Sequence, residues 1–216
     1  MLLTENITKS YNNLCILNNA SLSIQKGEIV SIVGASGAGK STLLHILGTL
    51  EKPDSGKLFL NNQDMLALKG KQLAAFRNKH IGFVFQFHHL LPEFSALENM
   101  IMPALITGEN QSNAKQKALK LLDRLNLSNR ASHKPNAMSG GEQQRVAIGR
   151  ALINNPDIIL ADEPTGNLDT QNAMAIFNLL LELRDEINQT FVVVTHNDSL
   201  VKKTDRIIHM KDGKTT

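Results

Sequence analysis

The sequence contains few of the residues that cross-link a chain or provide large aromatic rings: one cysteine, one tyrosine and no tryptophan among 216 residues. With Cys15 alone, no disulfide can form within the chain, and we expect a reducing compartment such as the cytosol. The N-terminus lacks the succession of basic, apolar and small residues that marks a secretion signal. No apolar run approaches the roughly 18 residues of a membrane-spanning helix, so we expect any role at a membrane to depend on a partner.

Charge of one sign is not concentrated in any block. The net charge of +3 comes from scattered lysines and arginines, so we predict no nucleic-acid partner. The same charge is equally compatible with a basic surface that lies near anionic lipid. With 42% hydrophobic residues the chain can bury a substantial core. This length indicates one domain over residues 1–216, with room for an inserted subdomain.

A complete phosphate-binding pattern, G-x-x-x-x-G-K-[ST], is present at residues 34–41. The apolar run 29–33 before it predicts a buried strand and residues 42–47 after it predict a helix, which is the context this motif needs. Lys40 would reach the β- and γ-phosphates of a nucleotide, and the Ser41 hydroxyl would ligate Mg²⁺. The alternative is an ordinary glycine-rich turn, which fits these flanks poorly. The residues assigned to nucleotide binding here are Gly34, Ser36, Gly37, Ala38, Gly39, Lys40, Ser41 and Thr42.

Residues 1–25 alternate between apolar and polar, most clearly around Leu22 and Ile24, which predicts a half-exposed antiparallel sheet. Asn12 and Asn13 are candidates for a hairpin turn between two of its strands. Tyr11 stands at this turn. Its ring could stack on a nucleotide base or could simply pack against the sheet.

Strands and helices alternate over the rest of the chain, which indicates an α/β fold whose parallel sheet is covered on both faces. Helical periodicity dominates residues 88–155, including an amphipathic helix at 115–126, and we expect this segment to be an inserted helical subdomain. The other predicted elements are a strand at 57–61, a helix around 69–79, and strands at 81–85, 158–163 and 191–195. Ligands of such sheets lie at the carboxyl ends of the strands. Four candidate groups stand at strand ends: Gly34, Gln86, Asp162 and His196.

These positions suggest roles in phosphoryl transfer. Asp162 would hold Mg²⁺, and Glu163 would orient and polarise the attacking water. His196 could hydrogen-bond the γ-phosphate, and Gln86 could contact Mg²⁺ or the water. Taken singly, Asp162 and Glu163 also fit a solvated acidic turn, and a lone histidine or glutamine is usually structural. The adjacent pair at 88–89 is rejected as a metal site because no cysteine or acidic partner is spaced to help.

A second glycine-containing helix start is predicted at Ser139, Gly140 and Gly141. Ser139 followed three residues later by Glu142 is the pattern of a capping box. Bare glycines at a helix start also leave N–H groups free for an anion. Two such helix starts in one chain suggest that a nucleotide is held between them.

Six features follow one another along the chain: the phosphate loop, Gln86, residues 139–141, residues 162–163, the turn 166–169 and His196. In this order they resemble the ATP-binding-cassette (ABC) transporter ATPases over essentially the whole chain. The resemblance implies a P-loop NTPase domain of ABC type that hydrolyses ATP with Mg²⁺. It also implies a homodimer sandwiching two ATP molecules, with residues 139–141 of one subunit closing on the phosphate loop of the other and Tyr11 stacking on adenine. Glu142 departs from the family pattern, where many members carry glutamine. The chain also lacks a Thr-x-Val-Gly-Glu segment before residue 139, which makes a fused exporter a poor match.

Within the family, residues 85–99 and 165–169 resemble the ATP subunit of the bacterial lipoprotein-releasing (Lol) complex, in a group that includes macrolide or peptide efflux and cell-division ATPases. This implies a peripheral protein at the cytoplasmic face of the inner membrane, bound to membrane-spanning permease subunits that alone touch the lipoprotein. A soluble cassette ATPase of DNA repair or translation is disfavoured because there is no long coiled-coil insertion and no second cassette. A nucleotide kinase is disfavoured by residues 139–141. A set of apolar residues after Gln86 is a candidate docking groove for a helix of the membrane subunit. These residues are Phe87, Leu90, Leu91, Pro92 and Phe94.

Overall fold

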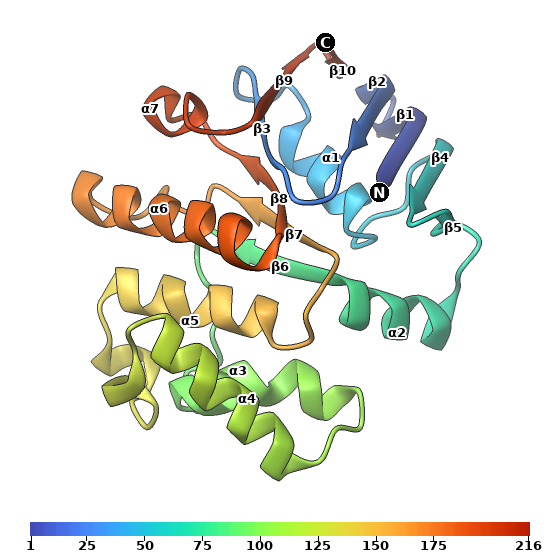
Figure 1. Ribbon diagram of the computed structural model, residues 1–216. Helices are drawn as coiled ribbons and strands as arrows, with labels where there is room; N and C mark the ends of the chain where they lie inside the picture. The colour runs from blue at the N-terminus through green and yellow to red at the C-terminus, as the bar shows by residue number, and fades with distance from the viewer.

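The computed structural model describes all 216 residues, which form two sheets and a layer of helices (Figure 1). A four-stranded sheet has the order β2-β1-β4-β5, and a six-stranded sheet has the order β10-β9-β3-β8-β7-β6. The elements are, in chain order, β1 (Leu2–Tyr11), β2 (Leu14–Ile24), β3 (Ile29–Val33), α1 (Lys40–Leu47), β4 (Ser55–Leu60), β5 (Gln63–Asp64), α2 (Gly70–His80), β6 (Ile81–Phe85), α3 (Ala96–Ile106), α4 (Gln111–Arg124), the 3-10 turns Ser128–Arg130 and Pro135–Ala137, α5 (Gly140–Leu152), β7 (Ile158–Asp162), α6 (Thr170–Ile187), β8 (Thr190–Val194), α7 (Asp198–Val201), β9 (Arg206–Lys211) and β10 (Lys214–Thr215).

The N-terminal sheet is antiparallel, as its alternating pattern predicts. Leu22 and Ile24 of β2 are buried, whereas the neighbouring Ser21 and Ser23 are exposed. The hairpin turn lies at Asn12–Asn13, whose φ values of 45° and 69° fall in the left-handed region that asparagine tolerates. The strand predicted at 57–61 is β4, and it pairs with β1 in this sheet.

The six-stranded sheet separates two hydrophobic cores. Four neighbouring strands, β3, β8, β7 and β6, run parallel with β6 at the edge of the sheet, and β9 adds a fifth parallel strand on the other side of β3. Because side chains alternate across a strand, Val193 faces one core and Val192 and Val194 face the other. The first core is shared with helices α3 to α6, and the second with α1 and the N-terminal sheet.

Residues 88–155 contain α3, α4, α5 and two 3-10 turns, and no strand. In Figure 1 these helices lie together, below α6. Helix α5 approaches α3 closely at Gly149, where an added Cβ would lie 2.4 Å from the Met100 Cε atom. We propose that residues 88–155 form a helical subdomain within a single domain.

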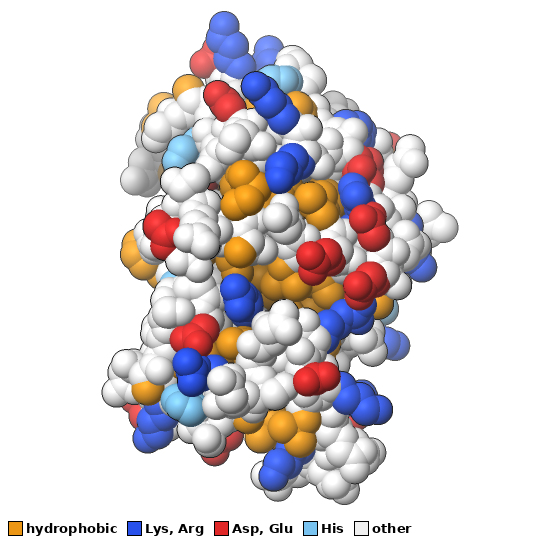
Figure 2. Space-filling model, turned by 60° about the vertical axis from the view of Figure 1, so that its left-hand side comes forward, with side chains coloured by type: hydrophobic (Ala, Val, Ile, Leu, Met, Phe, Trp, Pro, Cys, Tyr) orange, Lys and Arg blue, Asp and Glu red, His pale blue; other side chains and the backbone are white.

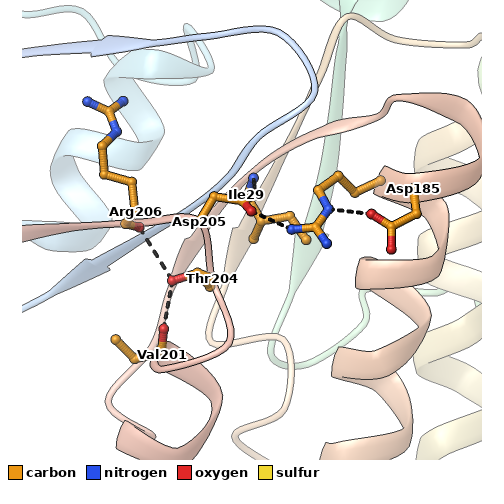
Figure 3. Close-up of polar contacts among 7 residues, drawn as sticks. Ile29, Asp185, Val201, Thr204, Asp205 and Arg206 are labelled. Atoms are coloured by element: carbon orange, nitrogen blue, oxygen red, sulfur yellow. Dashed lines mark hydrogen bonds and ion pairs between the residues drawn. The ribbon is translucent and has the colours of Figure 1, made fainter.

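The polar bonds around Asp205 fix where the phosphate-loop strand starts (Figure 3). The Ile29 N–H donates to the Asp205 carboxylate over 2.8 Å, and the Asp205 N–H donates to the Ile29 carbonyl over 3.0 Å. Arg184 of α6 donates to the same carboxylate over 2.6 Å. Burial opposes ionisation here, but these donors prevail and lower the pKa of Asp205. The amino end of β3 is therefore tied to α6, while its carboxyl end leads into the phosphate loop.

The surface carries charges of both signs. In Figure 2, basic and acidic side chains are interspersed over the face turned forward, with hydrophobic patches between them. No helix of the structure combines the length and the apolar character that a membrane crossing requires.

Candidate nucleotide site

The phosphate loop connects β3 to α1, as predicted. Gly39 is the N-cap residue of α1 with a φ of 95°, and no side chain caps this helix start. An added Cβ would meet the Ile16 carbonyl oxygen at 2.8 Å at Gly39, and nothing within 4 Å at Gly37. The loop therefore packs tightly on its inner side and is open at Gly37. A helix start whose first N–H groups are bound by no capping side chain is a natural position for phosphate oxygens.

Lys40 and Ser41 begin α1 and point into the same region. The Lys40 ammonium donates to the carbonyl oxygens of Gly34 and Ala35, each at 2.9 Å, so it lies folded over the loop. The Ser41 hydroxyl donates to the Asp162 carboxylate over 3.1 Å. The structure thus brings together two oxygen-bearing side chains that are 121 residues apart in sequence. Hydroxyl and carboxylate oxygens are the donors that Mg²⁺ prefers.

Glu163 and His196 meet at the ends of β7 and β8. The His196 Nδ1 atom is 2.9 Å from the Glu163 carboxylate. Glu163 has a φ of 45°, an uncommon conformation for a residue with a long side chain, and its N–H donates to the Val194 carbonyl over 2.9 Å. Glu163 lines a pocket of about 380 Å³ together with the phosphate loop.

Tyr11 lines the same pocket from the β1–β2 hairpin. Its hydroxyl donates to the carboxylate of Glu51, a residue just beyond α1. Lys9 lies over the Tyr11 ring, with its Nζ atom 5.3 Å from the ring centroid. Sequence reasoning identified Tyr11 but not Glu51 or Lys9, because no motif connects positions 40 residues apart.

Gln86 stands at the end of β6, as predicted, but its side chain is bound elsewhere. The Gln86 amide donates to the Asn167 side-chain oxygen over 2.8 Å, and the Asn167 amide donates to the Gln86 carbonyl over 3.2 Å. Gly166 permits this approach, since an added Cβ there would lie 2.8 Å from the Gln86 Nε2 atom. The structure therefore joins Gln86 to the 166–169 turn and not to Ser41 and Asp162. Asn167 was part of a recognised turn, but nothing in the sequence indicated this pair.

Residues 139–141 lie at the start of α5 and do not line the phosphate pocket of their own chain. The Ser139 hydroxyl accepts from the Glu142 N–H over 3.3 Å, and the Glu142 carboxylate accepts from the Ser139 N–H over 2.8 Å, which completes the predicted capping box. Arg130 donates to the same carboxylate over 2.7 Å. The Ser139 N–H, with Arg130 after it, lowers the pKa of Glu142.

Fold and site together define a P-loop nucleotide-binding protein. The sequence model of the family described as "ABC transporter" matches residues 17–166. Because this match covers more than half of the chain, the protein belongs to the ABC transporter family. The predicted family and fold class are confirmed.

Curated relatives match nearly the full chain. The "lipoprotein-releasing system ATP-binding protein LolD" of Bacteroides thetaiotaomicron is 56% identical over 99% of this chain and 98% of its own length. The protein of the same name from Cytophaga hutchinsonii is 54% identical over 96% of this chain and 94% of its own length.

Solved structures agree. The ATP-binding cassette MJ0796, a dimer in a post-hydrolysis state bound to ADP and Pi, is 43% identical with a TM-score of 0.90, over 100% of this chain and 96% of that one. Component cbiO1 of the Clostridium perfringens transporter complex cbiONQ is 27% identical, again with a TM-score of 0.90, over 100% and 86%.

Proposed function

We propose that the chain is the ATP-hydrolysing subunit of a bacterial lipoprotein-releasing ABC transporter. The carrying observation is the pocket at which the phosphate loop, the Ser41–Asp162 pair and Glu163 converge. The lipoprotein-releasing assignment is supported by relatives that share more than half of their residues with this chain over nearly its whole length. The same relatives favour this system over efflux or cell-division complexes.

The proposed roles follow from where each side chain lies. N–H groups of the phosphate loop and the Lys40 ammonium would bind the β- and γ-phosphates once Lys40 leaves the Gly34 and Ala35 carbonyls. Ser41 and Asp162 fit Mg²⁺, since both offer oxygen and already lie in contact. Bound there, Mg²⁺ would neutralise charge on the phosphates. Glu163 would accept a proton from the attacking water, and His196 holds that carboxylate in position until the γ-phosphate arrives.

Two further proposals concern Gln86 and the second subunit. Gln86 can contact Mg²⁺ or the water only after it exchanges Asn167 for the nucleotide site. Residues 139–141 lie outside the pocket of their own chain, and in Figure 1 α5 belongs to the lower helices whereas α1 lies among the upper strands. A head-to-tail homodimer would supply residues 139–141 to the partner's nucleotide, and the dimeric state of MJ0796 supports this arrangement.

The membrane subunit would bind at a cavity of about 390 Å³ between α2, β6, α3 and α5. Its walls include Phe85, Pro103 and Ile106, and Ile106 is 70% exposed. Of the apolar set after Gln86, Phe87, Leu91 and Phe94 are exposed, whereas Leu90 packs against the core. The cavity includes Phe85, beside Gln86, so the nucleotide and a membrane subunit bound there would affect each other. Binding to the membrane subunit would hold the chain at the cytoplasmic face of the inner membrane.

The membrane interaction is tested by copurification from detergent extracts. The Ile106→Asp variant should bind ATP like the parent and lose its membrane subunit, because a charge would enter an apolar interface. Leu119→Asp is the matched control, since Leu119 is 42% exposed on α4 outside this cavity. Equal recovery of the membrane subunit with both variants would place the docking surface elsewhere.

The transported substrate is tested in the host cell. Depleting the chain should leave lipoproteins in the inner membrane, and re-expression of the parent should restore their release. Normal lipoprotein release during depletion, together with retained ATPase activity of the purified complex, would overturn the lipoprotein assignment and leave the ABC ATPase assignment standing.

A further inference from the structure

Tyr11 is held by a network of charged side chains that are not part of the phosphate loop. Its hydroxyl donates to Glu51, whose carboxylate lies 3.4 Å from the Lys9 ammonium. Lys9 also lies 3.4 Å from the Asp54 carboxylate and donates to the Lys52 carbonyl over 2.8 Å. Asp54 in turn accepts from the Ser10 N–H over 2.7 Å. The two chain segments 9–11 and 51–54 are therefore joined by several polar contacts.

The geometry leaves only part of the Tyr11 ring available to a ligand. Lys9 lies over the ring and its side chain is largely buried, with 15% exposed. Tyr11 as a residue is 43% exposed and lines the pocket of the phosphate loop. A cation near one face and a hydrogen bond at the hydroxyl restrict the orientation of the ring in the wall of the pocket.

We propose that Glu51, supported by Lys9 and Asp54, is a positioning residue that fixes the Tyr11 ring as a stacking platform for the base of the nucleotide. This inference rests on the proposed nucleotide-binding function and adds a specific role to residues outside every motif. A ring with fewer accessible orientations loses less conformational entropy when the base stacks on it, so affinity for the base increases. Affinity for the phosphates does not depend on the ring.

The sequence offers an unusually clean probe, because Tyr11 is the only tyrosine and there is no tryptophan. The ultraviolet absorbance of tyrosinate therefore reports on this side chain alone. The hydrogen bond to Glu51, with burial after it, raises the pKa of Tyr11. The Glu51→Ala variant should titrate this phenol at lower pH than the parent. Glu5→Ala is the matched control, since Glu5 pairs with Lys57 over 3.1 Å on the same sheet and touches none of these groups.

Calorimetric binding of ATP and of inorganic tripolyphosphate separates the base from the phosphates. We expect Glu51→Ala to weaken ATP binding about three- to tenfold, a fraction of a base-stacking contact, with tripolyphosphate binding within about twofold of the parent. Glu51→Gln retains an oxygen acceptor for the hydroxyl and should restore most of the affinity. Tyr11→Phe should match Glu51→Ala, and the double variant should lose no more than either single one.

Each alternative outcome is decisive. Unchanged ATP affinity in Glu51→Ala, or an unshifted tyrosinate titration, would overturn the positioning role. Equal losses for ATP and tripolyphosphate would also overturn it, because Glu51 would then act through the phosphate loop. Failure of the parent protein to bind either ligand would instead overturn the proposed function.

Discussion

The starts of α1 and α5 look alike in sequence and differ in how their N–H groups are used. Both are glycine-containing helix starts. At α1, Gly39 is the N-cap and no side chain accepts from the first turn. At α5, Ser139 and Glu142 form a capping box, and Arg130 holds the Glu142 carboxylate. The first helix start is thus open to an external anion, while the second already carries an internal one.

This difference bears on how a nucleotide could be shared between two chains. We expect the α1 start to bind phosphate within a single chain, since Lys40 and Ser41 are its first residues and Asp162 lies beside Ser41, where Mg²⁺ would bind. The α5 start keeps only the donors not used by its capping box, so it suits a second, later contact with a phosphate already bound elsewhere. We therefore expect the two helix starts to respond differently to substitution, from loss of turnover to a modest change in stability.

The largest effect is expected from Lys40→Ala at the α1 start. ATP turnover should fall to background, because a full positive charge beside the β- and γ-phosphates is removed. A phosphate-release assay checks this, with Lys57→Ala as a control on the N-terminal sheet. Turnover within about tenfold of the parent would contradict the phosphate-loop assignment, since a charge contact of this kind is worth several kcal/mol in a dry site.

The open α1 start was predictable because its determinants are local. A contiguous motif between an apolar strand and a helix specifies both residues and conformation. Four strands of the larger sheet were predictable for a similar reason, since strand ends marked by Gln86, Asp162 and His196 follow apolar runs, whereas β9 and β10 were not predicted. The helix predicted at 115–126 instead spans Gln111–Arg124, because the Asn110 side chain caps its start by accepting from the Ser112 N–H.

The remaining contacts could not be predicted because they join distant, unpatterned residues. The Gln86 and Asn167 amides meet across 81 residues, and Tyr11 meets Glu51 across 40. Periodicity reports which face of an element is buried, and motifs report local chemistry. Neither reports which polar side chains from two loops will face each other, which depends on how the complete sheet positions those loops.

An intermediate effect is expected from Glu163→Gln, which tests the contact between two chains. The variant should bind ATP but hydrolyse it ~10²–10⁴ more slowly, because the base is lost and the phosphate contacts remain. Bound ATP should then hold two chains together, since residues 139–141 of each would close on the other's nucleotide. Sedimentation with ATP should show dimers for this variant. Monomers alone, at high protein and ATP concentrations, would contradict the sandwich dimer.

The smallest effect is expected at the α5 start, from Glu142→Ala compared with Glu142→Gln. The alanine variant loses both the capping box and the bond to Arg130, and at neutral pH its free energy of unfolding should fall by about 1 kcal/mol. Glutamine can still accept from the Ser139 N–H, so the glutamine variant should lose less stability.

The pKa of Glu142 is lowered in the folded protein. The contribution of ionised Glu142 to the free energy of unfolding is therefore complete above the pKa of the unfolded chain and is lost as pH falls through the pKa of the folded protein. Thermal unfolding from about pH 7 down to below about pH 4 should therefore show the parent approaching Glu142→Gln in stability. A gap between the two that persists at the lowest pH would show that ionised Glu142 does not stabilise this helix start; Glu182→Ala, on an exposed position of α6, controls for general loss of negative charge.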